Sequence, residues 1–160
     1  MARKSFSILE KFKKEKEGIK VNIMKITMEK VHKVALILIR NNKFLVCKED
    51  GLDKYIMPGG KIENNENFIR CLIREINEEL GAKVNKNSLR YLGKLIGEGE
   101  KNTFLEVELY QGKVVGKLKP SGEIKTIEWV GKNDKNKIKQ SSRFIKNKII
   151  PFLLKKGIIN

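Results

Sequence analysis

Three glutamates, Glu75, Glu78 and Glu79, stand close together in a stretch with helical periodicity. At about 100° per residue they share one sector of a helix predicted over residues 66–80, beside its apolar stripe. Like charges three and four residues apart repel by about 0.2–0.5 kcal/mol per pair. Mg²⁺ prefers oxygen ligands and would relieve this repulsion, so the three residues are candidate metal ligands. The alternative is a solvated acidic face, although such a cluster is unexpected in a chain so rich in lysine.

The tripeptide Pro58-Gly59-Gly60 lies between an extended segment and this helix. Glycine lets the backbone approach a ligand closely. A backbone carbonyl there would complete the ligands of a cation, and nearby amides would face phosphate oxygens.

The elements that must position these residues follow from periodicity and turn signals. The central helix is predicted to end at Gly81, and Asn41-Asn42 predicts the turn of a hairpin. Strands are predicted at 34–39, 44–47, 55–57, 89–95, 103–110 and 124–130, and a second helix at 142–156, kinked or restarted at Pro151. A short helix is predicted over 1–18, followed by a strand starting at Ile19, and 132–139 is interpreted as a solvated loop. This mixture predicts an α/β sandwich.

The length of 160 residues fits one domain. We divide the chain into a basic N-terminal extension (1–30), a domain (31–156) and a C-terminal tail (157–160). The longest apolar runs reach six residues, whereas a membrane helix needs about 20, so no membrane partner is expected. Cys47 and Cys71 lack metal or redox spacing, which favours reduced thiols in a cytoplasmic protein.

The net charge of +16 comes from 35 basic and 19 acidic residues. Clustered positive charge is typical of proteins that bind nucleic acids, because lysine and arginine neutralise phosphates. However, 29 of the basic residues are lysine and only 6 are arginine, and the chain is also rich in Ile and Asn. These three abundant residues have A/T-rich codons, so a biased genome would give the same composition. RNA therefore stays open as a partner.

Residues 60–82, GKIENNENFIRCLIREINEELGA, resemble the signature of the Nudix (MutT-type) hydrolases. That signature is G, five residues, E, seven residues, R-E, an aliphatic, any residue, E-E, any residue, G and an aliphatic. Only the last position departs, with Ala82 in place of a larger side chain. The matching residues are Gly60, Glu66, Arg74, Glu75, Ile76, Glu78, Glu79 and Gly81.

The resemblance implies a Nudix-type α/β/α sandwich with a mixed β-sheet and an enzyme that cleaves a pyrophosphate bond with Mg²⁺, or Mn²⁺ as substitute. By position, Glu75, Glu78 and Glu79 resemble the metal-binding and base-forming carboxylates, and the Gly60 carbonyl a further ligand. Arg74 and Glu66 resemble the pair that orients the catalytic helix and loop, with Gly59 in the same loop. Many members add a later carboxylate, for which Glu123 is the candidate.

The resemblance leaves the substrate open. The leading expectation is a nucleoside triphosphate, oxidised forms included, that yields a monophosphate and pyrophosphate. An enzyme acting on an RNA 5′ end is the alternative, and a non-catalytic nucleotide-binding module is the alternative of another class. Residues 97–99 replace the proline that marks many ADP-ribose enzymes, which disfavours that substrate. Many family members dimerise, so a homodimer is a further expectation.

Overall fold

A computed structural model describes residues 11–20 and 28–160 of the chain. Residues 11–20 are helical, so the predicted N-terminal helix continues through Gly18 and does not end there. Ile19 belongs to this helix, and the strand predicted to start at Ile19 is wrong at that residue. Ser7 and Glu10, proposed as a helix cap, and Val21 and Ile23, proposed as strand residues, lie outside the described part.

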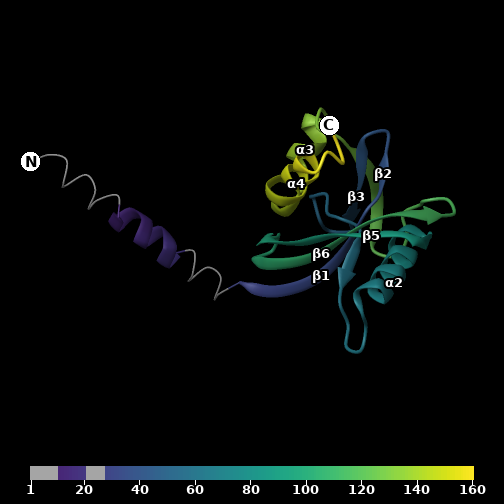
Figure 1. Cartoon of the computed structure of the whole chain (residues 1–160), viewed down its shortest axis with the longest axis horizontal. Coiled ribbons are helices and arrows are strands. Elements are labelled where there is room, and N and C mark those ends of the chain that lie inside the picture. Colours follow the sequence, from purple (N-terminus) through teal and green to yellow (C-terminus); the bar gives the residue numbers. More distant parts are fainter. Residues whose placement is uncertain (1–10, 21–27) are drawn as a thin grey trace, which may run out of the picture.

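Two β-sheets form the centre of the described domain (Figure 1). The first has the order β4–β1–β6–β5 and is mixed, because β1 and β6 are parallel while the other neighbours are antiparallel. The second is antiparallel with the order β2–β3–β7. The strands are β1 (Glu29–Ile37), β2 (Ile39–Arg40), β3 (Lys43–Glu49), β4 (Gly59–Lys61), β5 (Lys83–Glu98), β6 (Thr103–Val115) and β7 (Ile124–Val130).

The strand predicted over 34–39 is divided between the two sheets. The chain leaves β1 at Ile37 and enters β2 at Ile39, so one apolar run serves both sheets. The turn at Asn41-Asn42 has positive φ at both residues, 48° and 62°, as the predicted hairpin requires. The α/β class with a mixed sheet is confirmed, and the second sheet is an addition to the prediction.

Helix α2 (Phe68–Leu80) carries the acidic face. It begins two residues later than predicted, because the Asn67 side chain accepts a hydrogen bond from the Arg70 N–H and caps the helix. It ends as predicted at Gly81, whose φ of 60° lies in the left-handed region. Residues 119–121 then run along this end, and the backbone N–H of Ser121 donates to the Glu79 carbonyl over 2.9 Å.

The C-terminal part is also helical. A short helix α3 (Lys135–Lys139) replaces most of the loop predicted over 132–139. A π-helix η1 (Ile145–Ile149) precedes α4 (Ile150–Lys155), so the predicted restart at Pro151 takes this form. Proline cannot donate a helical hydrogen bond, and the wider π turn accommodates it. Residues 157–160, which we separated as a tail, pack onto the domain, since Ile159 is buried and Asn160 binds Asn42.

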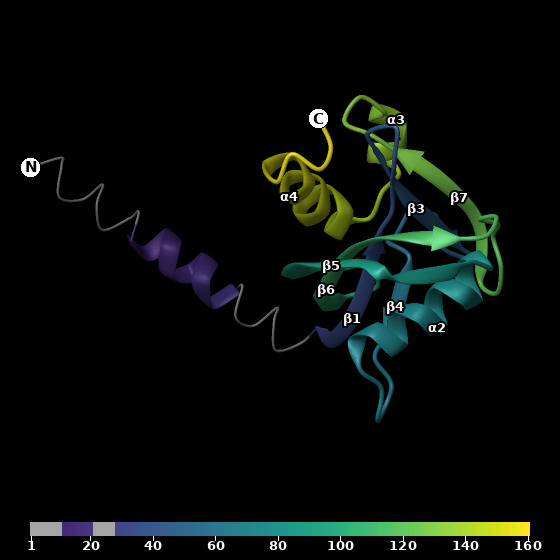
Figure 2. The same cartoon turned by 45° about the vertical axis from the view of Figure 1, so that its right-hand side comes forward.

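The helices lie on opposite sides of the sheets (Figure 2). Helix α2 covers one apolar cluster, and η1 and α4 cover another. The α2 cluster includes Val34, Leu36, Leu72, Ile76 and Leu80, and the second includes Ile37, Leu109, Ile145, Ile149 and Leu153. Ala82, where the family usually has a larger side chain, is buried in the α2 cluster. In residues 11–20 and 28–160 no helix is long and apolar enough to cross a membrane.

Candidate active site

Arg74 on α2 joins the helix to the loop before it. Its Nε and Nη2 donate to the two carboxylate oxygens of Glu66 over 3.0 and 2.9 Å. These bonds lower the pKa of Glu66 to about 2. Glu66 lies just outside the helix, so this fork holds the loop against α2, as the resemblance implied for the pair.

The same guanidinium also contacts the acidic face. Arg74 Nη1 donates to Glu75 over 2.8 Å and to Glu78 over 3.4 Å. In residues 11–20 and 28–160 no three His, Cys, Asp or Glu side chains gather around one point that would hold an ion. Glu75 and Glu78 would have to turn away from Arg74 for the three predicted ligands to meet.

Glu79 is oriented by the loop at Gly59. The Gly59 N–H donates to Glu79 Oε2 over 2.8 Å. Burial raises the pKa of Glu79 to about 8, and the charges of Glu75 and Glu49 add to the rise, while the Gly59 N–H and the charge of Lys33 oppose it. A partly desolvated carboxylate that resists ionisation in the protein alone is stabilised in its charged form by a nearby cation.

The two glycines of the loop are required for close approach. Gly59 has a φ of 129°, and a side chain there would collide with the Val34 carbonyl of β1. At Gly60 a Cβ would instead collide with the carboxylate of Glu75. The Gly60 backbone therefore lies directly against one of the predicted ligands.

The structure distinguishes the carbonyls of these glycines. The Leu36 N–H donates to the Pro58 carbonyl, which sets the hydrogen-bonded pairs between β1 and β4. Such pairs alternate along antiparallel strands, so Val34 and Gly60 form the next one. The Gly60 carbonyl, our predicted ligand, is thus directed at β1. The Gly59 carbonyl lies outside this pairing, on the edge strand β4, next to the N–H that binds Glu79.

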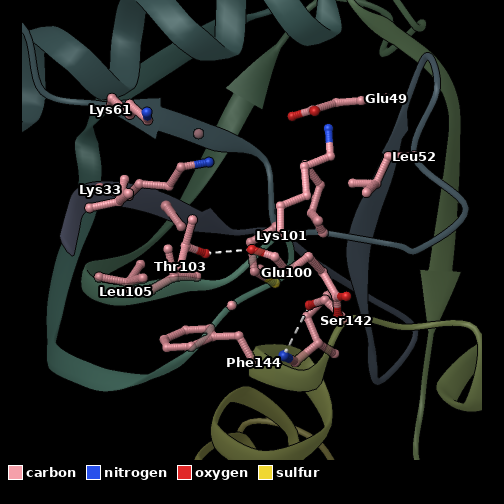
Figure 3. A pocket seen from close by; sticks show the side chains of 18 of the residues that line it. Lys33, Glu49, Leu52, Lys61, Glu100, Lys101, Thr103, Leu105, Ser142 and Phe144 are labelled. Carbon is pink, nitrogen blue, oxygen red and sulfur yellow. Dashed lines mark hydrogen bonds between the residues drawn. The ribbon is translucent and has the colours of Figure 1, made fainter. Parts of the chain in front are cut away.

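A cavity of about 170 Å³ opens beside Gly59 (Figure 3). It lies on the sheet face opposite α2, and its wall is largely apolar, with Leu52, Met57 and Phe144 among the lining residues. Typical ligand pockets span roughly 300–1,000 Å³, so this one suits a single ring system rather than a whole nucleotide. Charged side chains stand among the apolar ones: Lys33, Glu49, Lys61, Glu100 and Lys101.

Glu123 is not among the residues that line this cavity. Its side chain is exposed just before β7, and its carbonyl accepts the N–H of Asp50. The cavity carboxylate that raises the pKa of Glu79 is Glu49, at the end of β3. The sequence held no signal for Glu49, because it precedes an ordinary Asp-Gly turn and only the folded chain brings it to Gly59.

Cys47 and Cys71 are free and buried. His32, the only histidine of the sequence, binds Glu108 over 3.0 Å and packs its ring edge-on against Phe68. It lies on the α2 side of the sheet and does not line the cavity. Its predicted structural or solvated role agrees with this place.

The fold and the acidic helix define a family. The model of the NUDIX domain matches residues 30–149. The chain therefore belongs to the Nudix family, as residues 60–82 predicted. A solved NUDIX hydrolase from Nitrosomonas europaea has the same fold, with a TM-score of 0.63 at 18% identity over 81% of this chain and 89% of that one.

Two curated relatives share part of the sequence. The mRNA-decapping protein D10 of Fowlpox virus (strain NVSL) is 33% identical over 92 residues, covering 51% of this chain and 41% of the relative. The 8-oxo-dGTP diphosphatase of Buchnera aphidicola subsp. Schizaphis graminum (strain Sg) is 40% identical over 52 residues, covering 30% of this chain and 40% of the relative. The chain thus spans about two fifths of the length of each.

Proposed function

We propose that this protein is a Mg²⁺- or Mn²⁺-dependent pyrophosphohydrolase that converts a nucleoside triphosphate, oxidised forms included, into a monophosphate and pyrophosphate. The observation that carries the proposal is the position of Glu79. Glu79 is half-buried and accepts a hydrogen bond from the Gly59 N–H, and the same glycine loop borders a cavity the size of one ring system.

The donor chemistry fits a hard divalent cation. Glu75, Glu78 and Glu79 offer carboxylate oxygens, and Gly59 offers a carbonyl, which are the ligands that Mg²⁺ prefers. Arg74 neutralises Glu75 and Glu78 in the protein alone. We propose that these two carboxylates leave Arg74 for the cation, while the fork between Arg74 and Glu66 stays in place.

The chain's own residues then account for positioning. A bound cation of this kind neutralises phosphate oxygens and makes an attacking water more acidic. The oxygen of that water bonds to phosphorus, and the anhydride P–O bond to the leaving group breaks. A carboxylate of the α2 face accepts the proton that the water releases. Helix α2, fixed at the Glu66 fork and at Gly59, keeps the carboxylates in place for this attack.

The test is a substrate panel. Purified protein is incubated with nucleoside triphosphates, their oxidised forms, ADP-ribose and 5′-triphosphate RNA, each with Mg²⁺ and with excess EDTA. We expect turnover of at least one nucleoside triphosphate, its loss in EDTA, and an unchanged far-UV circular dichroism spectrum. Turnover that persists undiminished in EDTA would contradict the proposal, and tight nucleotide binding without hydrolysis would favour the non-catalytic module.

Action on an RNA 5′ end is the second candidate. It is supported by the net charge of +16 and by the partial similarity to a relative named as an mRNA-decapping protein. An RNA end and a free nucleotide present the same phosphate chain to α2. They differ in the length of polyanion beyond the site, so the salt dependence of turnover separates the two candidates.

A further inference from the structure

Two lysines face each other across the strands beside the cavity. Lys33 on β1 and Lys61 on β4 are direct partners in the antiparallel register, and both line the cavity. Like charges directly opposite one another destabilise a sheet. Lys61 has one ion pair, to Glu29 over 3.4 Å, between side chains that are each about two thirds exposed, which offsets little.

Lys33 has no ion-pair partner within 4 Å among the described residues, although it is half-buried. Its charge reaches the acidic site, because it lowers the pKa of Glu79. An unpaired ammonium group opposite a second lysine is unfavourable in the protein alone, and an anion between the two would relieve it.

A third lysine reaches the cavity from the other side. Lys101 and Asn102 are the central residues of the turn 100–103 in the connection between β5 and β6, and both have positive φ, 52° and 57°. Asn-Gly is the usual pair in such a turn, and lysine in the left-handed region costs about 1–2 kcal/mol. Residues held in such strained conformations cluster at ligand-binding and active sites. Figure 3 shows the ammonium groups of Lys101 and Lys33 directed toward the same part of the cavity.

The abundance of lysine does not explain this arrangement. Strand β1 contains a second lysine, Lys30, three residues before Lys33. Lys30 is exposed, and the alternation of side chains along the strand places it on the opposite face of the sheet. The cavity is lined by three lysines but only two carboxylates, Glu49 and Glu100. The Glu100 carboxylate already accepts the backbone N–H of Arg143 over 2.9 Å, which leaves Glu49 to balance the lysines. Three lysines therefore converge on one face of the Gly59 loop, opposite the carboxylates of α2.

We propose that Lys33, Lys61 and Lys101 form a phosphate-binding rim that holds the phosphates beyond those contacted at the acidic face. The rim makes the site selective for chains of three phosphates over chains of two. This inference rests on the proposed function, and it commits the substrate class to nucleoside or RNA 5′-triphosphates. Nucleoside diphosphate conjugates such as ADP-ribose lack the third phosphate group that the rim would bind.

The test uses two probes whose α–β linkage cannot be hydrolysed, α,β-methylene ATP and α,β-methylene ADP, which differ by one phosphate. Binding of each to the full chain is measured by calorimetry with Mg²⁺ present. We expect the triphosphate analogue to bind at least tenfold more tightly, because a charge-assisted hydrogen bond contributes about a factor of ten or more. Lys33→Gln should reduce this ratio about tenfold, and Lys61→Gln and Lys101→Gln should also lower it.

Two further variants keep the test specific. Lys30→Gln removes the same charge from the same strand on the other face, and it should leave the ratio unchanged. Lys101→Gly relieves the strained turn as well as removing the charge, so it should raise the Tm while lowering the ratio. A merely structural Lys101 would raise the Tm and leave the ratio alone.

The inference is overturned if the unmodified protein binds the two analogues equally tightly or binds neither. It is also overturned if the ratio of the two affinities is unchanged in Lys33→Gln, Lys61→Gln and Lys101→Gln. The proposed function fails separately, when no anhydride substrate is hydrolysed although the analogues still bind in the expected ratio.

Discussion

The Arg74 guanidinium binds three carboxylates at once, those of Glu66, Glu75 and Glu78. Its fork to Glu66 fixes the loop, and its third nitrogen, Nη1, donates to Glu75 and Glu78. Lysine has the same charge but no planar fork, so it cannot bind Glu66 through two parallel bonds. The role of Arg74 therefore depends on shape as much as on charge.

Replacing Arg74 with lysine tests this role. We expect Arg74→Lys to lower kcat/KM about 10- to 100-fold, because loss of the fork loosens the loop that precedes the catalytic face. Arg70→Lys is the matched control, since Arg70 is exposed one turn earlier on the same helix. Steady-state kinetics on the best substrate should show the loss in the first variant alone, and equal losses would refute a specific role.

Adjacent glycines should respond differently to the same substitution. Gly60→Ala pushes against the flexible end of the Glu75 side chain, so the protein should fold and lose tenfold or more in kcat. Gly59→Ala pushes against the backbone of β1 at a φ of 129°, so it should mainly lose stability. Thermal melts and steady-state kinetics of both variants measure these effects. An unchanged kcat in Gly60→Ala would show that the contact between Gly60 and the Glu75 carboxylate does not matter for activity.

Helix α2 is an element whose existence and acidic face were both predictable. Its apolar stripe, its signature residues and Gly81 are local features of the sequence, and they predicted its end and its acidic face. The start was less certain, because the cap is Asn67 and the capping bond depends on the loop conformation. Glu66 was thus assigned to the helix, although it acts from outside it.

Removing the cap tests the element itself. Asn67→Ala should lower the free energy of unfolding by about 1 kcal/mol, because the Arg70 N–H loses its acceptor. Urea denaturation followed by circular dichroism measures this change. Asn64→Ala, exposed in the same loop and outside the cap, is the matched control and should leave the midpoint unchanged. A denaturation midpoint unaffected by Asn67→Ala would show that the cap contributes nothing.

Other features could not be predicted from local pattern. The division of 34–39 between two sheets depends on strand pairing: residues up to Ile37 pair with β6, whereas Ile39 pairs with β3. Strand β5 extends well beyond the predicted 89–95, because β6 provides backbone partners for polar residues as well as apolar ones. The cavity residues Glu49, Lys33 and Lys101 come from three separate strands or turns, so only the fold reveals them as neighbours.

At the scale of the whole molecule, the dominant electrostatic feature is the net charge of +16. The phosphate-binding rim accounts for three lysines. The basic N-terminal extension adds charge outside the Nudix domain match, which begins at residue 30. If that extension serves RNA, its removal should weaken RNA binding without altering the chemistry at α2.

Deleting residues 1–20 distinguishes RNA binding from compositional bias. On the RNA hypothesis the deletion lowers affinity for 5′-triphosphate RNA and flattens the dependence of log Kd on log salt, because fewer counterions are released. Turnover of a free nucleoside triphosphate should stay the same in both proteins. Filter binding across a salt series measures the slopes, and identical slopes would assign the charge of the extension to composition alone.

The central claim is that the acidic face of α2 performs cation-dependent hydrolysis. Glu79→Gln tests it most directly, because the amide oxygen can still accept the Gly59 N–H while the charge is lost. With Mg²⁺ and the best substrate, we predict a fall in kcat of ~10²–10⁴, equivalent to about 3–5 kcal/mol of transition-state stabilisation. Lys83→Gln, exposed just beyond the helix cap, should retain nearly full turnover. Equal rates for Glu79→Gln and Lys83→Gln would contradict the account.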